Sequence, residues 1–307
     1  MTGEGFPSGS PRVRRWLGDV EPAWTALAFQ SFIALCNEPS ATNRALSIAN
    51  DLTRDELDSS AVARNALVLI RRAGVGDGLK LTATGNLTRS VVAEMIDLFD
   101  WPDFDKAEAF EFHKVVNEPD FLPLHFVRHV VEVARLVRKT RGALEPTRMG
   151  RELAEELQLR ALLAVLFHVT FWHCDLSYFG GGLHGTWPQS DVGVVLWSLS
   201  IGAHNWQTPE RLTRLCTVPI NGVVDAEWDS GSMMMEARIL RPLLWFGLLE
   251  HRREVIPDTR FGERHFYRKS PLFNRSFALM CESNASRRLS IDKKRVAGFA
   301  AAPVAAQ

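Results

Sequence analysis

The chain has few cysteines, no net charge and no long apolar run, and each absence excludes a class of protein. Its 307 residues include four cysteines, none of them in a Cys-x-x-Cys pair. Each lies in or beside an apolar stretch, so we expect buried, reduced thiols rather than disulfides or zinc ligands. The four are Cys36, Cys174, Cys216 and Cys281.

Charge and hydropathy narrow the partners further. Lysine and arginine number 36, equal to the 36 aspartates and glutamates. Binding of nucleic acid or an acidic membrane by the whole surface needs a positive field, which a chain without net charge lacks. Only local basic patches could bind such partners. The amino terminus lacks the apolar core of a signal peptide, and apolar runs such as 192–203 are too short to span a bilayer. These absences predict a cytoplasmic protein with no membrane partner.

The sequence also lacks the motifs of common cofactor and catalytic sites. The glycine-rich residues 74–78 follow an expected helix rather than a strand and contain no Gly-Lys-Ser/Thr, so they predict a turn and not a phosphate loop. The glycines at 180–182, with His184 and Trp187, look like the oxyanion loop of some esterases, but no Gly-x-Ser-x-Gly turn accompanies them. We therefore expect no cofactor.

Two nearby histidines, His168 and His173, are a further candidate for chemistry. A helical metal pair wants ligands at i and i+4. The two histidines are five residues apart, about 500° of helical rotation, so they do not share a face well. With Phe167, Phe171 and Trp172 beside them, the pattern favours packed histidines over metal ligands.

What the chain does have is a short phrase that occurs twice, as Gly78-Leu79-Lys80-Leu81-Thr82-Ala83-Thr84-Gly85 and as Gly142-Ala143-Leu144-Glu145-Pro146-Thr147-Arg148-Met149-Gly150. In both copies a turn leads to a leucine, then to Thr-x-x-Gly and an apolar-periodic stretch. We interpret Thr82 and Thr147 as helix N-caps that follow a hairpin. We interpret Gly85 and Gly150 as close-packing positions.

The same plan occurs a third time with poor sequence identity. A helix expected over 233–249 precedes Arg252–Ile256, a polar turn, and a strand within His265–Lys269. A new helix is expected to start at Ser270-Pro271. Earlier in the chain, Thr53-Arg54-Asp55-Glu56 predicts a capping box at a helix start.

The sequence therefore predicts a mainly α fold of tandem winged-helix-like modules with short β-hairpins. The expected boundaries are a first module at 19–98, a second at 99–168, and a C-terminal helical module with a third wing at 169–283. The polar or low-complexity ends, 1–18 and 284–307, predict a disordered amino terminus and a flexible tail.

Four segments resemble a group of uncharacterised bacterial proteins related to the family named after open reading frame three of the Ri plasmid. They are Leu79–Leu87, Asn117–Phe121, Arg138–Gly150 and Ser270–Asn274. The resemblance covers roughly residues 20–283. It implies the module plan and a bacterial source, and it carries over no catalytic or ligand-binding residue.

Basic side chains around the expected hairpins are the candidate functional residues. In a DNA-bound winged helix, a hairpin contacts backbone or minor groove while a helix enters the major groove. Exposed cations at the hairpins would neutralise phosphates, or they would only complement the acidic 94–120 segment. The candidates are Arg135, Arg138, Lys139, Arg141, Arg148, Arg151, Arg268 and Lys269.

Three functions remain open at this stage. The leading one is a non-catalytic bacterial protein that binds duplex nucleic acid through the basic hairpins. The alternative is a protein-interaction or structural module with no nucleic-acid role, because winged helices also serve as protein contacts. The third is an enzyme with a pocket in the 168–206 region.

Overall fold

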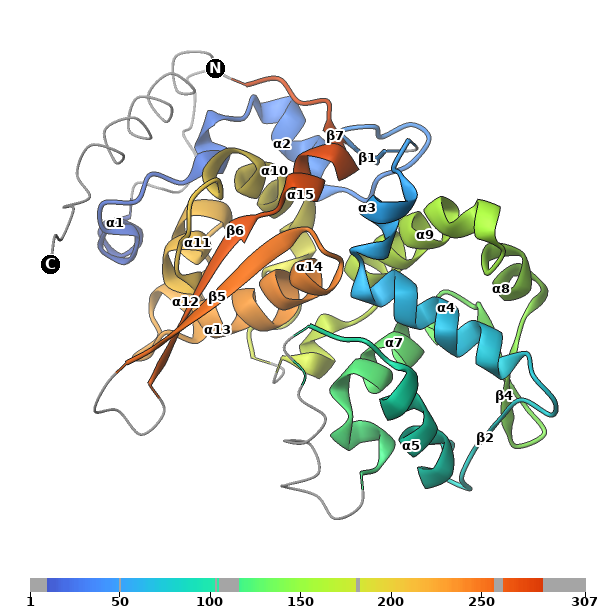
Figure 1. The fold of residues 1–307 in the computed structure, drawn as a ribbon. Helices are drawn as coiled ribbons and strands as arrows, with labels where there is room; N and C mark the ends of the chain where they lie inside the picture. Colours follow the sequence, from blue (N-terminus) through green and yellow to red (C-terminus); the bar gives the residue numbers. More distant parts are fainter. Residues whose placement is uncertain are drawn as a thin grey trace, which may run out of the picture. The chain divides into compact units, whose positions relative to one another are not determined.

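The chain folds into two compact units, each built mainly from helices with small antiparallel sheets of short strands (Figure 1). The computed structural model describes residues 10–49, 51–102, 104, 116–180, 183–256 and 262–283. Unit 1 comprises the chain up to Ile48, Ser177–Arg241 and the chain from Leu249 onward, and unit 2 comprises Ala49–Leu176 and Pro242–Leu248. The mainly helical fold with short hairpins is confirmed. No described helix combines the length and apolar character needed to cross a membrane.

The units do not share the module boundaries expected from the sequence. The boundary expected between residues 98 and 99 falls inside unit 2, and unit 1 gathers three separate stretches of the chain. The expected tail at 284–307 lies outside the described residues.

Unit 2 places one three-stranded sheet among its helices. Near the start of this unit, Thr53 forms the predicted capping box before the first helix. Glu56 N donates to the Thr53 hydroxyl, and Thr53 N donates to the Glu56 carboxylate. The elements are α3 (Arg54–Asp58), α4 (Ala61–Ala73), β2 (Leu79–Lys80), α5 (Arg89–Leu98), η2 (Glu118–Asp120), α7 (Leu122–Val133), β3 (Val137–Thr140), β4 (Ala143–Pro146), α8 (Arg148–Leu153), η3 (Glu156–Gln158) and α9 (Leu159–Trp172).

Both copies of the repeated phrase contribute to this one sheet. β2, from the first copy, pairs antiparallel with β4, from the second, and β4 also pairs with β3, which gives the order β2–β4–β3. Leu79 and Lys139 lie on either side of Leu144. β2 is only two residues long, and the edge of β4 satisfies its backbone groups. The two copies are therefore parts of one unit rather than two separate hairpins.

The predicted cap is correct for one threonine and wrong for the other. Thr147 caps α8, because Gly150 N donates to its hydroxyl at 3.0 Å. The hydroxyl of Thr82 instead accepts from Asn86 N at 3.2 Å within a turn, and α5 begins only at Arg89. The first copy of the phrase thus leads into a loop and not directly into a helix.

The two glycines of the phrase serve different purposes. A Cβ on Gly150 would overlap the backbone carbonyl of Leu136, so the close-packing prediction is confirmed there. Gly85 has φ +84°, and the atom nearest to its Cβ position is Lys139 Nζ at 3.7 Å. Gly85 is needed for a left-handed turn, which glycine adopts without steric penalty.

The centre of unit 2 is α7. Its side chains at Phe126, Val127 and Val130 are fully buried, and α4, α5 and α9 pack against it. Trp245, in the 242–248 segment of unit 2, lies 4.7 Å from Phe126 and 5.4 Å from Trp101, measured between ring centroids. Burial of large aromatic rings of this kind dominates the stability of a core.

Unit 1 contains two small antiparallel sheets, β1–β7 and β5–β6. α14 begins at Arg241, the last residue of that stretch of unit 1, and continues into unit 2. The elements are α1 (Pro11–Leu17), η1 (Ala23–Ala26), α2 (Phe29–Cys36), β1 (Leu46–Ile48), η4 (Leu176–Phe179), η5 (Gln189–Asp191), α10 (Val192–Gly202), α11 (Pro209–Cys216), α12 (Asn221–Val224), α13 (Ser230–Met235), the π-helix η6 (Glu236–Leu240), α14 (Arg241–Trp245), β5 (Leu249–Val255), β6 (Glu263–Lys269), α15 (Pro271–Ser276) and β7 (Phe277–Leu279).

The third copy of the plan lies in unit 1 and repeats the element order of unit 2. A helix, α10, leads to Gln207, which forms a single antiparallel bridge with Tyr267 of β6. α11, the short α12, α13 with the π-helix η6, α14 (which continues into unit 2) and the β5–β6 hairpin follow. Ser270 then caps α15 by accepting from Phe273 N, as Thr147 caps α8. Both units therefore contain helix, strand segment, helix, helix and hairpin, with the first strand segment beside the last strand.

The amino terminus is more ordered than expected. Residues 1–9 lie outside the described ranges, but Pro11–Leu17 forms α1. Proline near the helix start favours this conformation, and Leu17 is buried. Trp16 packs on a cluster of Trp187, Val223 and Met234. Residues 1–18 are mostly polar in composition, but Trp16 and Leu17 near the end of this segment are apolar and pack against the rest of unit 1.

Candidate nucleic-acid interface

Three of the predicted basic residues lie exposed at the β3–β4 hairpin of unit 2. Arg138 is on β3, Arg141 is in the hairpin turn with φ 47°, and Arg135 follows α7 with φ 55°. Among the described residues, none of the three forms an ion pair, although Glu145 lies opposite Arg138 across the hairpin. Arginines in this state keep their hydrogen-bond donors available for phosphate or carboxylate.

Three other candidates in unit 2 are engaged locally. Lys139 lies 3.7 Å from Glu132, measured from Nζ to the nearer carboxylate oxygen. Arg148 donates to Glu152 at 2.8 Å, and this hydrogen bond raises the pKa of the Arg148 guanidinium. Arg151 donates to the carbonyl of Pro146 at 2.8 Å. All three are exposed, but a ligand would have to compete with these partners.

The two candidates in unit 1 do not form a free basic patch. Arg268 donates to Glu250 at 2.6 Å and lies over the ring of Trp206, 4.5 Å from its centroid. Lys269 is only 9% exposed and donates to the carbonyl of Ser200 and to Asn274 Oδ1. Strand alternation places Lys269 opposite Leu249 on the inner face of the hairpin, which the sequence pattern did not indicate.

The structure adds one cation that sequence reasoning missed. Lys80 is exposed on β2 and lies opposite Ala143, while Arg138 lies opposite Glu145. Residues two apart on a strand point to the same face, so Lys80, Arg138 and Glu145 share one face of the sheet. The only sequence signal was the short strand around Leu79, whose partner strand is far away in the chain.

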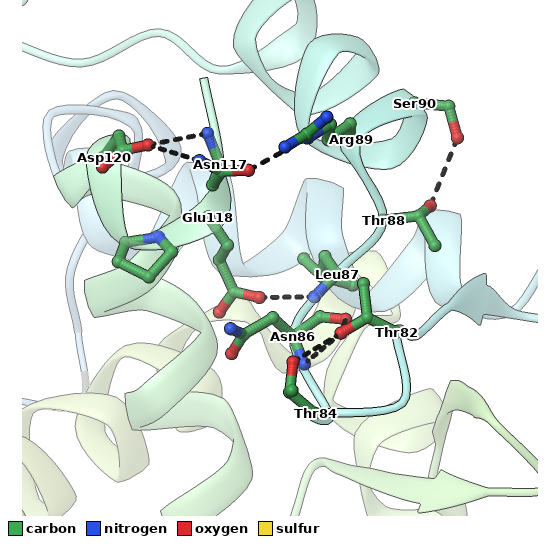
Figure 2. A pocket seen from close by; sticks show the side chains of 11 residues that line it. Thr82, Thr84, Asn86, Leu87, Thr88, Arg89, Ser90, Asn117, Glu118 and Asp120 are labelled. Atoms are coloured by element: carbon green, nitrogen blue, oxygen red, sulfur yellow. Dashed lines mark hydrogen bonds between the residues drawn. The ribbon is translucent and has the colours of Figure 1, made fainter. Parts of the chain in front are cut away.

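A polar depression of about 650 Å³ lies beside the hairpin in unit 2 (Figure 2). Arg89 donates to Asn117 Oδ1 at 3.1 Å, and Asn117 donates to Asp120 at 2.9 Å. The loop that forms one wall contains Gly85, next to Lys139. The lining residues are Thr82, Thr84, Asn86, Leu87, Thr88, Arg89, Ser90, Asn117, Glu118, Pro119 and Asp120.

A buried ion pair connects Glu118, which lines this depression, to Arg128 on α7. Glu118 is 2% exposed and Arg128 is 4% exposed, and the two form a hydrogen-bonded pair. Glu118 also accepts from Leu87 N at 2.6 Å, and Arg128 donates to the carbonyl of Gly85 at 2.6 Å. Burial acts to raise the pKa of Glu118, but hydrogen bonds from His125 and Leu87 and the charge of Arg128 outweigh it and lower that pKa.

The helix that precedes each hairpin is covered, so it cannot serve as a recognition helix as it stands. The exposed side chains of α7 are those of Leu122 and Val133, both apolar. A helix that reads bases in the major groove presents polar side chains to the base edges. In unit 1, Arg238 is fully buried and donates to the carbonyls of Leu183 and Gly185.

The region considered for an enzyme includes a hydrogen bond between two potential catalytic groups. His184, with φ 57°, places Nε2 2.8 Å from Ser230 Oγ. Ser230 is 1% exposed, and Arg238 holds the loop that carries His184. The pair therefore works as an internal fastening of the loop to α13. Sequence reasoning missed Ser230 because it is distant from His184 along the chain.

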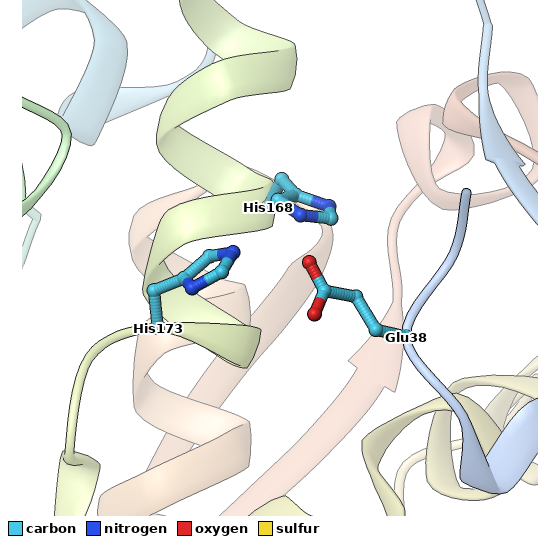
Figure 3. Close-up of side chains that lie close together, drawn as sticks. All are labelled: Glu38, His168 and His173. Carbon is cyan, nitrogen blue, oxygen red and sulfur yellow. The ribbon is translucent and has the colours of Figure 1, made fainter. Parts of the chain in front are cut away.

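The histidines of α9 are closer to one another than the sequence suggested. α9 ends at Trp172, and His173 has φ −122° and ψ −25°, so it leaves the helical path. The ring centroids of His168 and His173 lie 5.2 Å apart, and Figure 3 shows both side chains at the end of α9. Glu38, which the same figure draws, belongs to unit 1. The expectation of separate faces assumed a helix that continues, and it is wrong for that reason.

Comparison with known proteins finds a family model that matches the part of the chain that contains the three-stranded sheet. Residues 58–159 match the Y4jL N-terminal domain. Over 93 residues the chain is 33% identical to "Uncharacterized protein y4jL" of Sinorhizobium fredii (strain NBRC 101917 / NGR234), which covers 30% of this chain and 42% of that protein. The chain thus spans less than half of the curated relative that it matches. No solved structure matches the chain.

The match agrees with the structure in its extent. It lies within unit 2 and includes α4, β2, α5, α7, β3, β4 and α8. It supports the expectation of an uncharacterised bacterial family, and it assigns no activity.

Proposed function

We propose that the chain is a non-catalytic protein of tandem winged-helix type that binds the backbone of duplex nucleic acid through the β3–β4 hairpin of unit 2. The winged-helix assignment is supported by the element order helix, strand, helix, helix, hairpin, which occurs once in each unit. In this assignment β3–β4 and β5–β6 are the wings.

The observation that carries the binding proposal is the pair of exposed arginines on the hairpin of unit 2. Arg138 and Arg141 are exposed, with no ion-pair partner in the described part of the chain. Lys80 lies on the same sheet face as Arg138. Cations on a wing bind phosphates and displace condensed counterions from the nucleic acid.

The same structure limits the kind of binding. The exposed ends of α7 are apolar, so base-edge hydrogen bonds from this helix are not part of the proposal. Phosphate contacts fix position without reading sequence. We therefore propose binding with little sequence preference and a strong dependence on salt.

The test is fluorescence anisotropy with a labelled duplex of random sequence at several salt concentrations. The variant Arg138→Gln/Arg141→Gln should bind more weakly and should flatten the slope of log K against log salt by about one for each arginine removed. Arg148→Gln is the matched control, because Arg148 is exposed in the same unit but paired with Glu152. An unchanged slope in the double variant would contradict the proposal.

A protein partner is the second candidate, and the burial of α7 favours it. A winged helix whose third helix is covered has lost the surface that usually enters the major groove. If the hairpin binds an acidic protein surface instead, the full chain shows no duplex binding even at low salt. The double arginine variant would then weaken the protein complex, whereas Arg148→Gln would leave the affinity of that complex unchanged.

A further inference from the structure

The carboxyl end of α9 brings two imidazole rings together in unit 2, independently of the proposed interface. α9 runs from Leu159 to Trp172, and His173 occupies its C-cap. Because His173 leaves the helical path, its ring approaches that of His168 to 5.2 Å between centroids. The two residues are five positions apart, a spacing that a continuous helix would turn to different sides.

His168 contacts its neighbour Trp172 through a face of its ring. The imidazole of His168 is stacked on Trp172, with 5.4 Å between centroids and 22° between the planes. Stacking occupies a face of the ring, whereas metal ions bind in the ring plane through Nδ1 or Nε2. His168 is half-buried and His173 is exposed, so solvent reaches the pair from the side of His173.

The separation of the ring nitrogens suits a shared ion. One nitrogen of each ring lies within 4.8 Å of the other. Two nitrogens bound tetrahedrally to zinc at about 2.0–2.1 Å lie roughly 3.4 Å apart. A small rotation of the exposed His173 ring is enough to close that difference, because its side chain is not packed into the core.

We propose that His168 and His173 form a binding site for a first-row divalent transition metal, of which Zn²⁺ is the representative. Imidazole suits Zn²⁺, Co²⁺ and Ni²⁺, whereas Mg²⁺ and Ca²⁺ prefer oxygen ligands. Two protein ligands leave further coordination positions for water or other donors. Metal binding here holds the end of α9 in the conformation in which the helix stops at Trp172.

The experiment uses the full chain without a polyhistidine tag, freed of metal by a chelator and titrated with Co²⁺ and Zn²⁺. We expect calorimetry to show one ion bound per chain. The absorption spectrum of the Co²⁺ form should report nitrogen ligands and the coordination number. His168→Gln and His173→Gln should each weaken binding at least about tenfold, since the loss of mere outer partners of a metal site costs that much. Mg²⁺ should not compete.

The control is His204→Gln, which removes an exposed histidine of unit 1 and should leave the affinity unchanged. His173 is exposed, so its variant tests the site even if His168→Gln disturbs the packing against Trp172. Equal affinity in His173→Gln and the unaltered chain would overturn the proposal. Weak binding of several ions per chain, reduced as much by His204→Gln as by the two site variants, would overturn it as well.

Discussion

The two units follow the same order of elements, but their hairpins differ in length and in the state of their charges. In unit 2 the strands β3 and β4 have four residues each, and Arg138 and Arg141 are exposed without ion-pair partners among the described residues. In unit 1 the strands β5 and β6 have seven residues each. There, Arg252 pairs with Glu254, and Arg268 pairs with Glu250. The same scaffold therefore presents one surface with available cations and one that neutralises itself.

The buried cations of the two units differ in a similar way. Arg128 of unit 2 is paired with the carboxylate of Glu118, whereas Arg238 of unit 1 donates to backbone carbonyls, including those of Leu183 and Gly185. An ion pair removed from water loses much when one partner is deleted, because the other charge remains buried and uncompensated. In each unit, the helical segment before the hairpin is therefore held by a buried arginine, Arg128 on α7 and Arg238 on η6. These two arginines are not available to a ligand.

Breaking the buried ion pair of unit 2 should give the largest effect. Glu118→Gln leaves Arg128 without its counter-charge and should lower the free energy of unfolding by about 3–5 kcal/mol. Urea denaturation followed by circular dichroism measures the change. The control is Arg54→Gln, which removes exposed ion pairs with Asp58 and Glu156 and should cost no more than about 1 kcal/mol for each pair. A loss in Glu118→Gln as small as that of the control would show that the pair contributes only like a surface pair.

The second effect sharpens the comparison of the helices that follow the hairpins. Gly150 and Phe273 occupy equivalent places, third after the caps Thr147 and Ser270. Gly150→Ala places a Cβ against the backbone carbonyl of Leu136 and should destabilise the protein by about 1–3 kcal/mol, the usual cost of overpacking.

The matched control for that substitution is Gly142→Ala, where φ is +78° and no heavy atom lies within 4 Å of the Cβ position. It reports the cost of the left-handed conformation alone, about 1–2 kcal/mol. Thermal unfolding of both variants, combined with amide exchange of β3, separates the causes. If Gly150→Ala leaves the exchange of β3 unchanged, the tight contact with Leu136 is not what limits this position.

Local features of this fold could be predicted from the sequence, and long-range ones could not. The hairpins, the cap at Thr147 and the capping box at Thr53 depend on neighbouring residues, and the structure confirms them. The pairing of β2 with β4 joins residues far apart in the chain, and no local pattern specifies it. The repeat therefore suggested two modules where one sheet exists.

The candidate site shows the same division. Exposure of Arg138 and Arg141 follows from a basic turn, which the sequence displays. The burial of Lys269 depends on the strand register with Leu249, and the approach of His173 to His168 depends on where α9 ends. Neither is visible in spacing alone.

The smallest effect concerns pH and has opposite signs in the two units. In unit 2 the folded-state pKa of Glu118 is lowered, so its contribution to stability is present above the ordinary glutamate pKa of about 4.3 and is lost as the pH falls through the folded-state value. In unit 1 burial raises the pKa of Asp191. The folded form then binds the proton more readily, and stability increases as the pH falls from the raised value towards the ordinary aspartate pKa of about 3.9.

Urea denaturation between pH 3 and 6 can separate these contributions with one variant for each unit. Glu118→Gln should reduce the loss of stability at the acidic end, because the group that must be protonated on unfolding is gone. Asp191→Asn should remove the opposing gain and should raise stability most near pH 6, where the buried carboxylate is charged. It should also lower the pKa of the Cys36 thiol, which burial first, and then the Asp191 charge, raises to about 11. Parallel pH profiles for the two variants would show that the two units do not differ in the sign of their response to pH.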